Sequence, residues 1–444
     1  MKKKIKNFWE YYRELRHTHG VDIATAMVIR NFRKKYLRFT EISNKENKLQ
    51  YGKAIGVDDL FYQRFPHLVP ILPSLPHIDA QRKINLMTLS LNGKHIFGGI
   101  ATSLIFAMNL STKMNIKLRI VCTDVPGTLE NLSEFLERYN IQFDLNNVEL
   151  FNAAPRSVYN PVHLEVRKDD IFIATTWWSA YLTDQLQPNN KFIYFVQDYE
   201  PIFSANGDEQ VLANGTYLLK DRFIPIVNTK ILHDYYVQNN YEEFSKHNLY
   251  FEPAFSDSIF TPRLTSKDED AMKILFFYAR PSVARNLFYL GLNSIKKAFD
   301  DGLLDSKKWE VYFAGAENRE IEISKGFIAK NLGKMDIQDY GKFSHNVDLA
   351  ISLMMAPHPS YPPLEMAASG ARVVSTQYKN KTDLTNYSKN IFLADYSVES
   401  IIKKIRQTTE ISETERIENV KSSHIQNNWN EAFEDVINKI QKYF

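Results

Sequence analysis

Short apolar runs alternate with amphipathic stretches along most of this chain, and that alternation limits its fold more than any other feature. The runs are rich in β-branched and aromatic residues, as is typical of strands buried on both faces. The stretches between them have helical spacing. Strands separated by helices predict a parallel sheet with helices on both faces. In the first half of the chain we expect strands at Ile84–Ser90, Leu118–Thr123, Val148–Phe151, Asp170–Thr175, Phe192–Val196 and Ile224–Asn228.

The alternation is interrupted once and then resumes. Residues 252–270 contain prolines, serines and an acidic cluster at 268–270, which is typical of a solvated linker. The pattern from 413 to 443 has apolar residues every three to five positions and predicts one long helix. Between them, a second doubly wound domain is expected with strands at Lys273–Ala279, Val311–Ala314, Leu349–Met355, Arg372–Thr376 and Ile391–Ala394.

A chain of 444 residues accommodates two domains of ordinary size. We therefore expect an α/β protein of two Rossmann-like doubly wound domains with a cleft between them. The expected boundaries are 1–78 for a basic, mainly helical N-terminal extension, 79–260 for the first domain, 261–410 for the second, and 411–444 for a C-terminal helix that packs back across the junction.

Residues 1–38 contain eleven lysines and arginines against three acidic residues, interleaved with aromatic side chains. This composition is typical of a helix that lies on an anionic membrane. The alternatives are a helix packed on its own protein and a nucleic-acid-binding arm, although no recognition motif accompanies the charge, so we expect no nucleic-acid partner. The chain has no bilayer-length apolar stretch and no apolar core of a signal peptide. We expect a cytoplasmic protein at the inner face of the cell membrane.

Ligands of open α/β sheets bind beyond the carboxyl ends of the strands, so residues at those ends are candidates. Gly98 and Gly99 open an expected helix, where bare backbone and free N–H groups suit an anion. A tight turn without a ligand is the alternative. Arg280 ends the first strand of the second domain and Arg285 follows it, so either guanidinium could pair with phosphate oxygens. A surface ion pair is the alternative for both.

Two further segments complete the candidates for binding a diphosphate. Lys334, preceded by Leu332 and Gly333, could place a charge beside a leaving diphosphate, or be merely solvated. The segment 357–370 is the most specific signal, because prolines pre-set a helix start whose free amides suit phosphate. Glu365 in its first turn could accept hydrogen bonds from sugar hydroxyls, or merely favour the helix dipole. The same segment contributes His358, Tyr361, Pro363 and Leu364 as candidates for donor binding.

The acceptor-side candidates follow two strands of the first domain. Trp177 and Trp178 could stack on sugar rings, and Gln197 and Asp198 could orient an acceptor hydroxyl. The alternatives are that the tryptophans belong to the core and that Asp198 caps a turn.

The ordered set of Gly98-Gly99, Arg280 with Arg285, Lys334 and the segment 363–370 resembles the retaining GT-B glycosyltransferases of family four. Three strings are more similar still to the WsaF-like rhamnosyltransferases that build bacterial surface glycans: ATTWWSA at 174–180, FVQDYEP at 195–201 and APHPSYPPLEM at 356–366. The resemblance covers roughly residues 80 to 410.

The resemblance implies a role for each matching residue. Arg280 and Lys334 would bind the donor diphosphate, Glu365 the nucleotide pentose, and the backbone at 332–333 the base. The wider family has a second glutamate eight positions before the one that matches Glu365, where this chain has Pro357 followed by His358. His358 would take part of that role, or be a structural loop histidine.

The expected function is therefore a glycosyltransferase that moves a sugar, rhamnose from dTDP-rhamnose, to a growing cell-surface glycan with retention of configuration. The nucleotide sugar is a co-substrate, the acceptor a glycan or lipid-linked glycan, and no cofactor or metal is expected. The alternatives are a nucleotide-sugar epimerase of the same architecture and a non-catalytic glycan-binding protein. The catalytic candidates are Arg280, Lys334 and Glu365.

Overall fold

A computed structural model describes residues 55–91, 96, 98–154, 156–186, 191–268 and 270–444. The chain divides into two compact units, Met1–Arg64 and Phe65–Phe444. In the first unit only the end is described, which includes the helix α2 (Val57–Arg64). The basic segment 1–38, expected at a membrane surface, lies outside the described residues.

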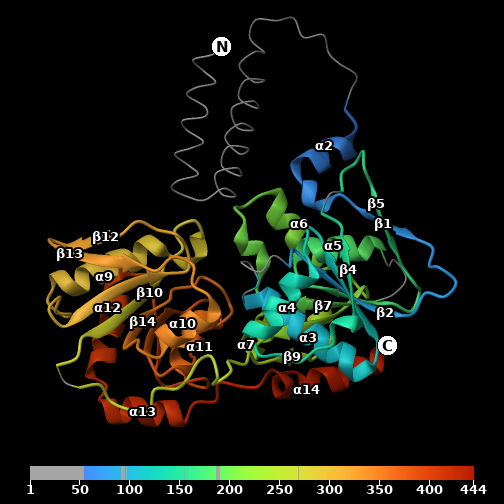
Figure 1. Cartoon of the computed structure of the whole chain (residues 1–444). Coiled ribbons are helices and arrows are strands. Elements are labelled where there is room, and N and C mark those ends of the chain that lie inside the picture. The colour runs from blue at the N-terminus through green and yellow to red at the C-terminus, as the bar shows by residue number, and fades with distance from the viewer. Residues whose placement is uncertain (1–54, 92–95, 97, 155, 187–190, 269) are drawn as a thin grey trace, which may run out of the picture. The chain divides into compact units, whose positions relative to one another are not determined.

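The unit Phe65–Phe444 contains two sheets of seven strands (Figure 1). The first sheet is parallel throughout, in the order β4-β3-β2-β6-β7-β8-β9. Its first six strands follow the Rossmann order 3-2-1-4-5-6. Successive strands are therefore added on one side of β2 up to β4 and, after a reversal, on its other side from β6 onward. The strands are β2 (Lys83–Thr88), β3 (Lys117–Cys122), β4 (Val148–Asn152), β6 (Ile171–Ala174), β7 (Phe192–Val196), β8 (Phe223–Asn228) and β9 (Tyr250–Phe251).

The second sheet has the order β12-β13-β11-β10-β14-β15-β16 and repeats the same topology from β13 onward. Only β12 is antiparallel, to β13. The reversal here lies between β10 and β14. The strands are β10 (Lys273–Tyr278), β11 (Trp309–Ala314), β12 (Ile321–Ser324), β13 (Phe327–Asn331), β14 (Leu349–Ile351), β15 (Arg372–Thr376) and β16 (Ile391–Ala394).

Helices connect the parallel strands, as the expectation of two doubly wound α/β domains requires. Those between strands of the first sheet are α3 (Gly98–Met114), α4 (Leu129–Arg138), α5 (Trp177–Leu186), α6 (Asp208–Thr216), α7 (Lys230–Gln238) and α8 (Glu242–Lys246). Those between strands of the second are α9 (Phe288–Asp300), α10 (Ile337–Ser344) and α11 (Tyr361–Ala368), and α12 (Val398–Glu410) follows its last strand.

Two expectations about the ends of the folded region were wrong. The strand β1 (Ile71–Ser74) pairs with β5 (Val162–Glu165), so part of the segment assigned to the N-terminal extension belongs to the compact unit. The tail is two helices rather than one, α13 (Glu413–Lys421) and α14 (Trp429–Ile440). Asn428 caps α14 by accepting a hydrogen bond from the N–H of Asn430, so a new helix begins where the apolar spacing suggested continuity.

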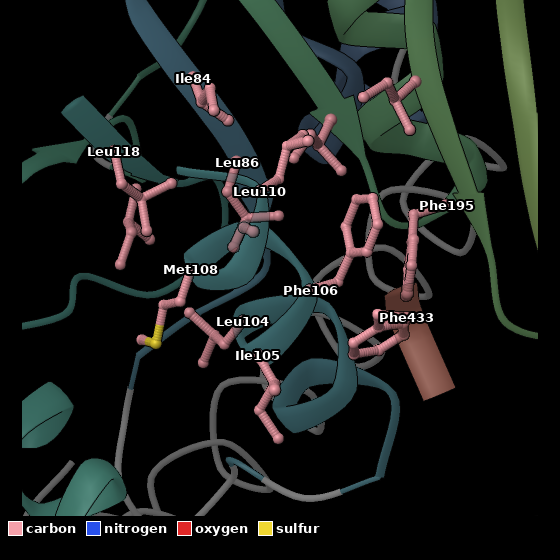
Figure 2. Packing of buried hydrophobic residues seen from close by; sticks show 14 of the residues in the cluster. Ile84, Leu86, Leu104, Ile105, Phe106, Met108, Leu110, Leu118, Phe195 and Phe433 are labelled. Carbon is pink, nitrogen blue, oxygen red and sulfur yellow. The ribbon is translucent and has the colours of Figure 1, made fainter. Parts of the chain in front are cut away.

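The C-terminal helix α14 completes the core of the first sheet. Phe433 is fully buried and lies edge-on to Phe106 of α3 and to Phe195 of β7. Figure 2 shows these three rings together, with Phe433 on the red C-terminal segment. By contrast, Arg416 of α13 is buried beside the second sheet, where it donates to the carbonyl oxygens of Arg263 and Gly370 at 2.9 Å each. The tail therefore packs on both sheets.

None of the described helices is both long enough and apolar enough to cross a bilayer.

Candidate functional site

The candidate site forms at the reversal point of the second sheet, where a ligand crevice is expected. After β10 come Arg280 and Arg285, and after β14 comes the loop that leads into α11. The backbone links the two sides, since Arg285 accepts a hydrogen bond from the N–H of Met355 at 2.8 Å. The topology thus brings the donor-side candidates of two separate sequence segments to one edge.

The charges of Arg280, Arg285 and Glu365 all act on the phenol of Tyr278, the last residue of β10. Burial raises the pKa of Tyr278, the charge of Arg280 opposes that rise, and the charge of Glu365 adds to it. Arg280 lies with its guanidinium carbon 6.0 Å from the centre of the Tyr278 ring. Partial burial lowers the pKa of Lys334, and the neighbouring charge of Arg280 lowers it further. Arg280 therefore lies near enough to Lys334 for their charges to interact, and Arg280 and Glu365 both act on the phenol of Tyr278.

The loop before Lys334 has a shape that requires glycine. Gly333 has a φ of +64°, and a β-carbon there would lie 2.5 Å from Oε1 of Glu317. The N–H of Gly315 donates to its carbonyl oxygen at 2.9 Å, and the N–H of Leu332 donates to Phe313 at 2.7 Å. Backbone bonds to neighbouring segments thus fix the position of Lys334.

Glu365 lies on α11 beside the hydroxyl of Tyr340. Burial raises the pKa of Glu365 to about 8, and the Tyr340 hydroxyl only partly offsets this effect. A carboxyl kept from water favours its neutral form unless a ligand supplies hydrogen bonds. The next residue toward the N-terminus, Leu364, is fully buried in the core, and Pro363 is buried as well. The Leu364 side chain therefore packs the helix onto its sheet, which leaves only its backbone for the donor binding that the sequence predicted.

His358 is buried, with 5% of its surface exposed, and its tautomer follows from its contacts. Its Nδ1 accepts a hydrogen bond from the N–H of Ser360 at 2.9 Å, so in the neutral ring the proton is on Nε2. That Nε2 has no partner among the described residues. Burial and the charge of Lys381 lower the pKa of His358 to about 3, so the ring is neutral at ordinary pH. The site thus holds a buried N–H donor without an acceptor, which is costly unless a ligand provides one.

Lys381 is a site residue that the sequence analysis missed. It is fully buried, and its ammonium donates to the carbonyl oxygens of Met354 and His358 at 3.1 Å each. Burial lowers its pKa to about 7, although the charge of Asp198 opposes the shift. Lys381 follows β15, so the rule that led to Arg280 and Lys334 could have found it.

Tyr361, the first residue of α11, connects the two sheets. Thr102 donates its single hydroxyl proton to the carbonyl of Gly98 at 2.9 Å, so Tyr361 donates to Thr102 at 2.8 Å. The Tyr361 oxygen in turn accepts from the amide of Asn228 at 2.8 Å. Gln197 joins this network by accepting from Asn228 at 3.0 Å and donating to the carbonyl of Gly99 at 2.9 Å. The candidates Gly98, Gly99, Gln197 and Tyr361 therefore lie together.

The acceptor-side carboxylate Asp198 faces cations of the second sheet. Burial raises its pKa, while the charges of Arg285 and Lys381 act against that rise. The guanidinium carbon of Arg285 lies 3.7 Å from the centre of the Phe203 ring. Burial lowers the pKa of Arg285, and the charge of Asp198 opposes that effect. Sequence reasoning missed the neighbouring Glu200, whose carboxyl pKa rises to about 8 through burial and the charge of Asp198.

The two acceptor-side tryptophans differ in exposure. Trp177 is 3% exposed, and the centre of its ring lies 5.6 Å from that of His67. Its backbone N–H donates to the carboxylate of Glu200. The expectation that Trp177 stacks on a sugar was therefore wrong, because its ring belongs to the core. Trp178 is half-buried, and its indole N–H has no partner among the described residues.

Comparison with known proteins agrees with this architecture. The profile described as "WsaF, N-terminal domain" matches residues 83–230, and the one described as "WsaF, C-terminal domain" matches residues 273–406. The O-antigen biosynthesis protein RfbC of Myxococcus xanthus is 33% identical over 241 residues, which is 53% of this chain and 18% of that protein. The chain thus spans less than a fifth of this relative.

Solved structures show the fold. WaaG, a glycosyltransferase involved in lipopolysaccharide biosynthesis, is similar with a TM-score of 0.52 and 10% identity, over 80% of this chain and 99% of that one. A glycosyltransferase from Rickettsia africae ESF-5 has a TM-score of 0.50 and 13% identity, over 82% of this chain and 100% of that one. The architecture is GT-B, with two Rossmann-like domains.

Proposed function

The chain belongs to the WsaF family, and from this premise we propose that it is a glycosyltransferase of surface polysaccharide synthesis. The observation that supports the proposal is that Arg280, after β10, interacts with the charge of Lys334 and acts with Glu365 on the phenol of Tyr278. Cations beside a helix start suit a diphosphate, and a carboxyl one turn away suits a pentose.

The departing diphosphate carries the charge that develops in the reaction. Arg280 and Lys334 stabilise it, together with the N–H of Tyr361 at the start of α11, where no side chain caps the helix and where Pro362 and Pro363 carry no N–H. These groups act without a metal ion in this proposal. In the free protein, burial and then the repulsion by Arg280 lower the pKa of Lys334. Binding of the anion offsets this repulsion between the two cations.

Glu365 and His358 hold the rest of the donor. Glu365 accepts hydrogen bonds from the pentose hydroxyls, which favours its ionised form and reverses the effect of burial on its pKa. His358 donates its unpartnered Nε2–H to an oxygen of the transferred sugar, where the wider family has a glutamate. Because its Nδ1 already accepts a hydrogen bond from Ser360, the neutral imidazole has only a donor left, so it selects a sugar oxygen that accepts.

The acceptor enters from the first sheet. Asp198 orients the acceptor hydroxyl by accepting a hydrogen bond from it, and the charges of Arg285 and Lys381 favour its ionised form against the burial that raises its pKa. The hydroxyl oxygen bonds to the anomeric carbon as the bond to the diphosphate oxygen breaks, and the hydroxyl proton passes to the diphosphate. The resemblance to WsaF-like enzymes further supports rhamnose from dTDP-rhamnose as donor, with retention of configuration.

Thermal stabilisation by a panel of uridine, guanosine and deoxythymidine diphosphate sugars tests donor binding, and product analysis tests transfer. Lys334→Ala and Glu365→Ala should each lower the transfer rate by about 100-fold or more while leaving the fold intact. The matched controls are Lys421→Ala and Glu418→Gln on the exposed face of α13, which should change nothing. Full turnover in either site variant would remove that residue from the mechanism.

Two experimental outcomes would indicate a function other than glycosyl transfer. A free epimerised nucleotide sugar formed without acceptor would identify an epimerase, and the absence of stabilisation by every nucleotide sugar would indicate a non-catalytic glycan-binding protein.

We also propose that the basic segment 1–38 holds the protein at an anionic membrane. Deletion of 1–38 should abolish sedimentation with anionic vesicles and leave donor binding unchanged. Undiminished vesicle binding would show that another part of the chain is responsible.

A further inference from the structure

A groove of about 950 Å³ lies outside the site described above, between α3, the segment 139–143, the linker at 256–258 and α14. Its walls are unusual in chemistry, because seven of its 21 lining residues carry a side-chain amide. These are Asn109, Asn140, Gln142, Asn427, Asn428, Asn430 and Asn438.

An amide both donates and accepts hydrogen bonds, as a sugar hydroxyl does. Contacts between the walls use only part of this capacity. Asn109 donates to the Oδ1 of Asn430 at 2.9 Å, and Asn427 donates to Asp257 at 2.8 Å. Among the described residues, Gln142 and Asn438 have no side-chain hydrogen bond. The groove is therefore held in shape while keeping free amide groups.

Aromatic rings add the apolar surface that a sugar ring requires. Trp429 is half-buried and stacks on Phe433, with ring centres 5.2 Å apart, so its orientation is fixed. Phe143 lines the groove from the opposite segment. Rigid aromatic rings among amides suit the apolar faces and hydroxyl rims of pyranoses.

The charges of the groove select against anionic ligands. Lys113 faces Asp257, Glu431 and Glu434, so the lining is net negative. Nucleic acids and phosphorylated lipids would be repelled by this wall. A neutral polyhydroxyl ligand meets no such barrier.

One end of the groove reaches toward the donor side. Tyr139 lines the groove, and the carbonyl of the preceding Arg138 accepts a hydrogen bond from Gln338 at 2.7 Å. Gln338 lies in the first turn of α10, the helix that follows Lys334. The wall that begins at Tyr139 is therefore bonded, through Arg138, to the helix that begins just beyond a proposed catalytic residue.

We propose that this groove binds a neutral oligosaccharide, the part of the acceptor glycan that has already been built. The inference rests on the proposed function for the identity of its ligand. Occupation of the groove holds a long acceptor on the enzyme, whereas an acceptor of one or two sugars does not reach it.

The probe is the set of neutral oligosaccharides released by mild acid from the surface polysaccharide of the source organism, separated by length. Saturation-transfer NMR without donor measures their binding to the full chain. Two variants disturb the groove: Gln142→Ala with Asn438→Ala removes free amides, and Thr112→Trp fills the space from an exposed position on α3. The control, Asn386→Ala with Gln407→Ala, removes one amide of each kind elsewhere.

Both groove variants should weaken binding of the longer oligosaccharides about tenfold, the double alanine variant through two lost hydrogen bonds and Thr112→Trp through lost space, with no change in the control. Their KM for a long acceptor should rise by a similar factor, while the rate with a disaccharide acceptor stays unchanged. Failure of every oligosaccharide to bind the unmodified chain, or equal binding by groove and control variants, overturns the inference. Absence of transfer to any acceptor would instead refute the proposed function, and the NMR binding result would still decide the groove.

Discussion

Replacement of Glu365 by glutamine should make the folded protein more stable at alkaline pH while removing its activity. Burial raises the pKa of the Glu365 carboxyl from 4.5 to about 8. The folded state therefore keeps this proton up to about pH 8, whereas the unfolded chain releases it near its usual pKa. The contribution of the protonated carboxyl to stability is complete below the unfolded pKa and is lost as the pH rises toward 8.

The size of the effect follows from the shift. At about 1.4 kcal/mol per pKa unit, a rise from 4.5 to about 8 gives an upper bound of about 5 kcal/mol. Glu365 is only half-buried, so water and local relaxation reduce the bound, and we expect about 2 kcal/mol. Glutamine has the shape of glutamate but cannot ionise. The variant therefore does not lose stability as the pH rises toward 8.

Urea unfolding of both proteins at pH 5, 7 and 9 measures the difference. The stability of Glu365→Gln relative to the parent should increase from pH 5 to pH 8 and then level off. Comparison with the parent removes the effect of Glu200, which has a similar pKa in both proteins. The control Glu418→Gln should show no pH-dependent difference. A Glu365→Gln curve parallel to the parent across this range would refute the assignment of a half-buried carboxyl with a raised pKa.

Three further substitutions test single contacts. Tyr361→Phe removes the hydroxyl that accepts from Asn228, and unfolding in urea should show a loss of about 1–3 kcal/mol; no loss would mean that water replaces these bonds. Gly333→Ala should cost about 1–3 kcal/mol and weaken donor binding by calorimetry, because its φ is +64° and its β-carbon meets Glu317; donor affinity equal to the parent would contradict this. Phe433→Ala should lower the unfolding free energy by about 3–5 kcal/mol, whereas a loss below about 1 kcal/mol would show that α14 is dispensable for the first core.

The fold was predictable to a large extent because its signal is local. Buried parallel strands need continuous apolar runs, and β7 and β15 begin and end at the residues that the sequence predicted. The elements that were not predicted lack this signal. The short strands β1 and β5 pair across about 90 positions of the sequence, and only that pairing defines them as strands.

The candidate site was predictable where a charged side chain follows directly on an expected strand or belongs to a recognisable motif. Arg280, Lys334 and Glu365 were predicted in this way, and the structure places Arg280 near Lys334 and lets Arg280 and Glu365 act on the same phenol, that of Tyr278. Lys381 and Glu200 also follow strands but carried no motif, and their interest arises from burial that no local pattern encodes.

The sequence by itself determined the class of fold, the edges where ligands can bind and the charge of the groups placed there, because hydrophobic period and side-chain chemistry are local properties. Only the tertiary structure decided which of those groups are kept from water. It left the His358 Nε2–H without an acceptor, set the pKa of Glu365 near 8 and buried the ring of Trp177. Burial is a sum over contacts from distant segments, so it exists only once the chain has folded.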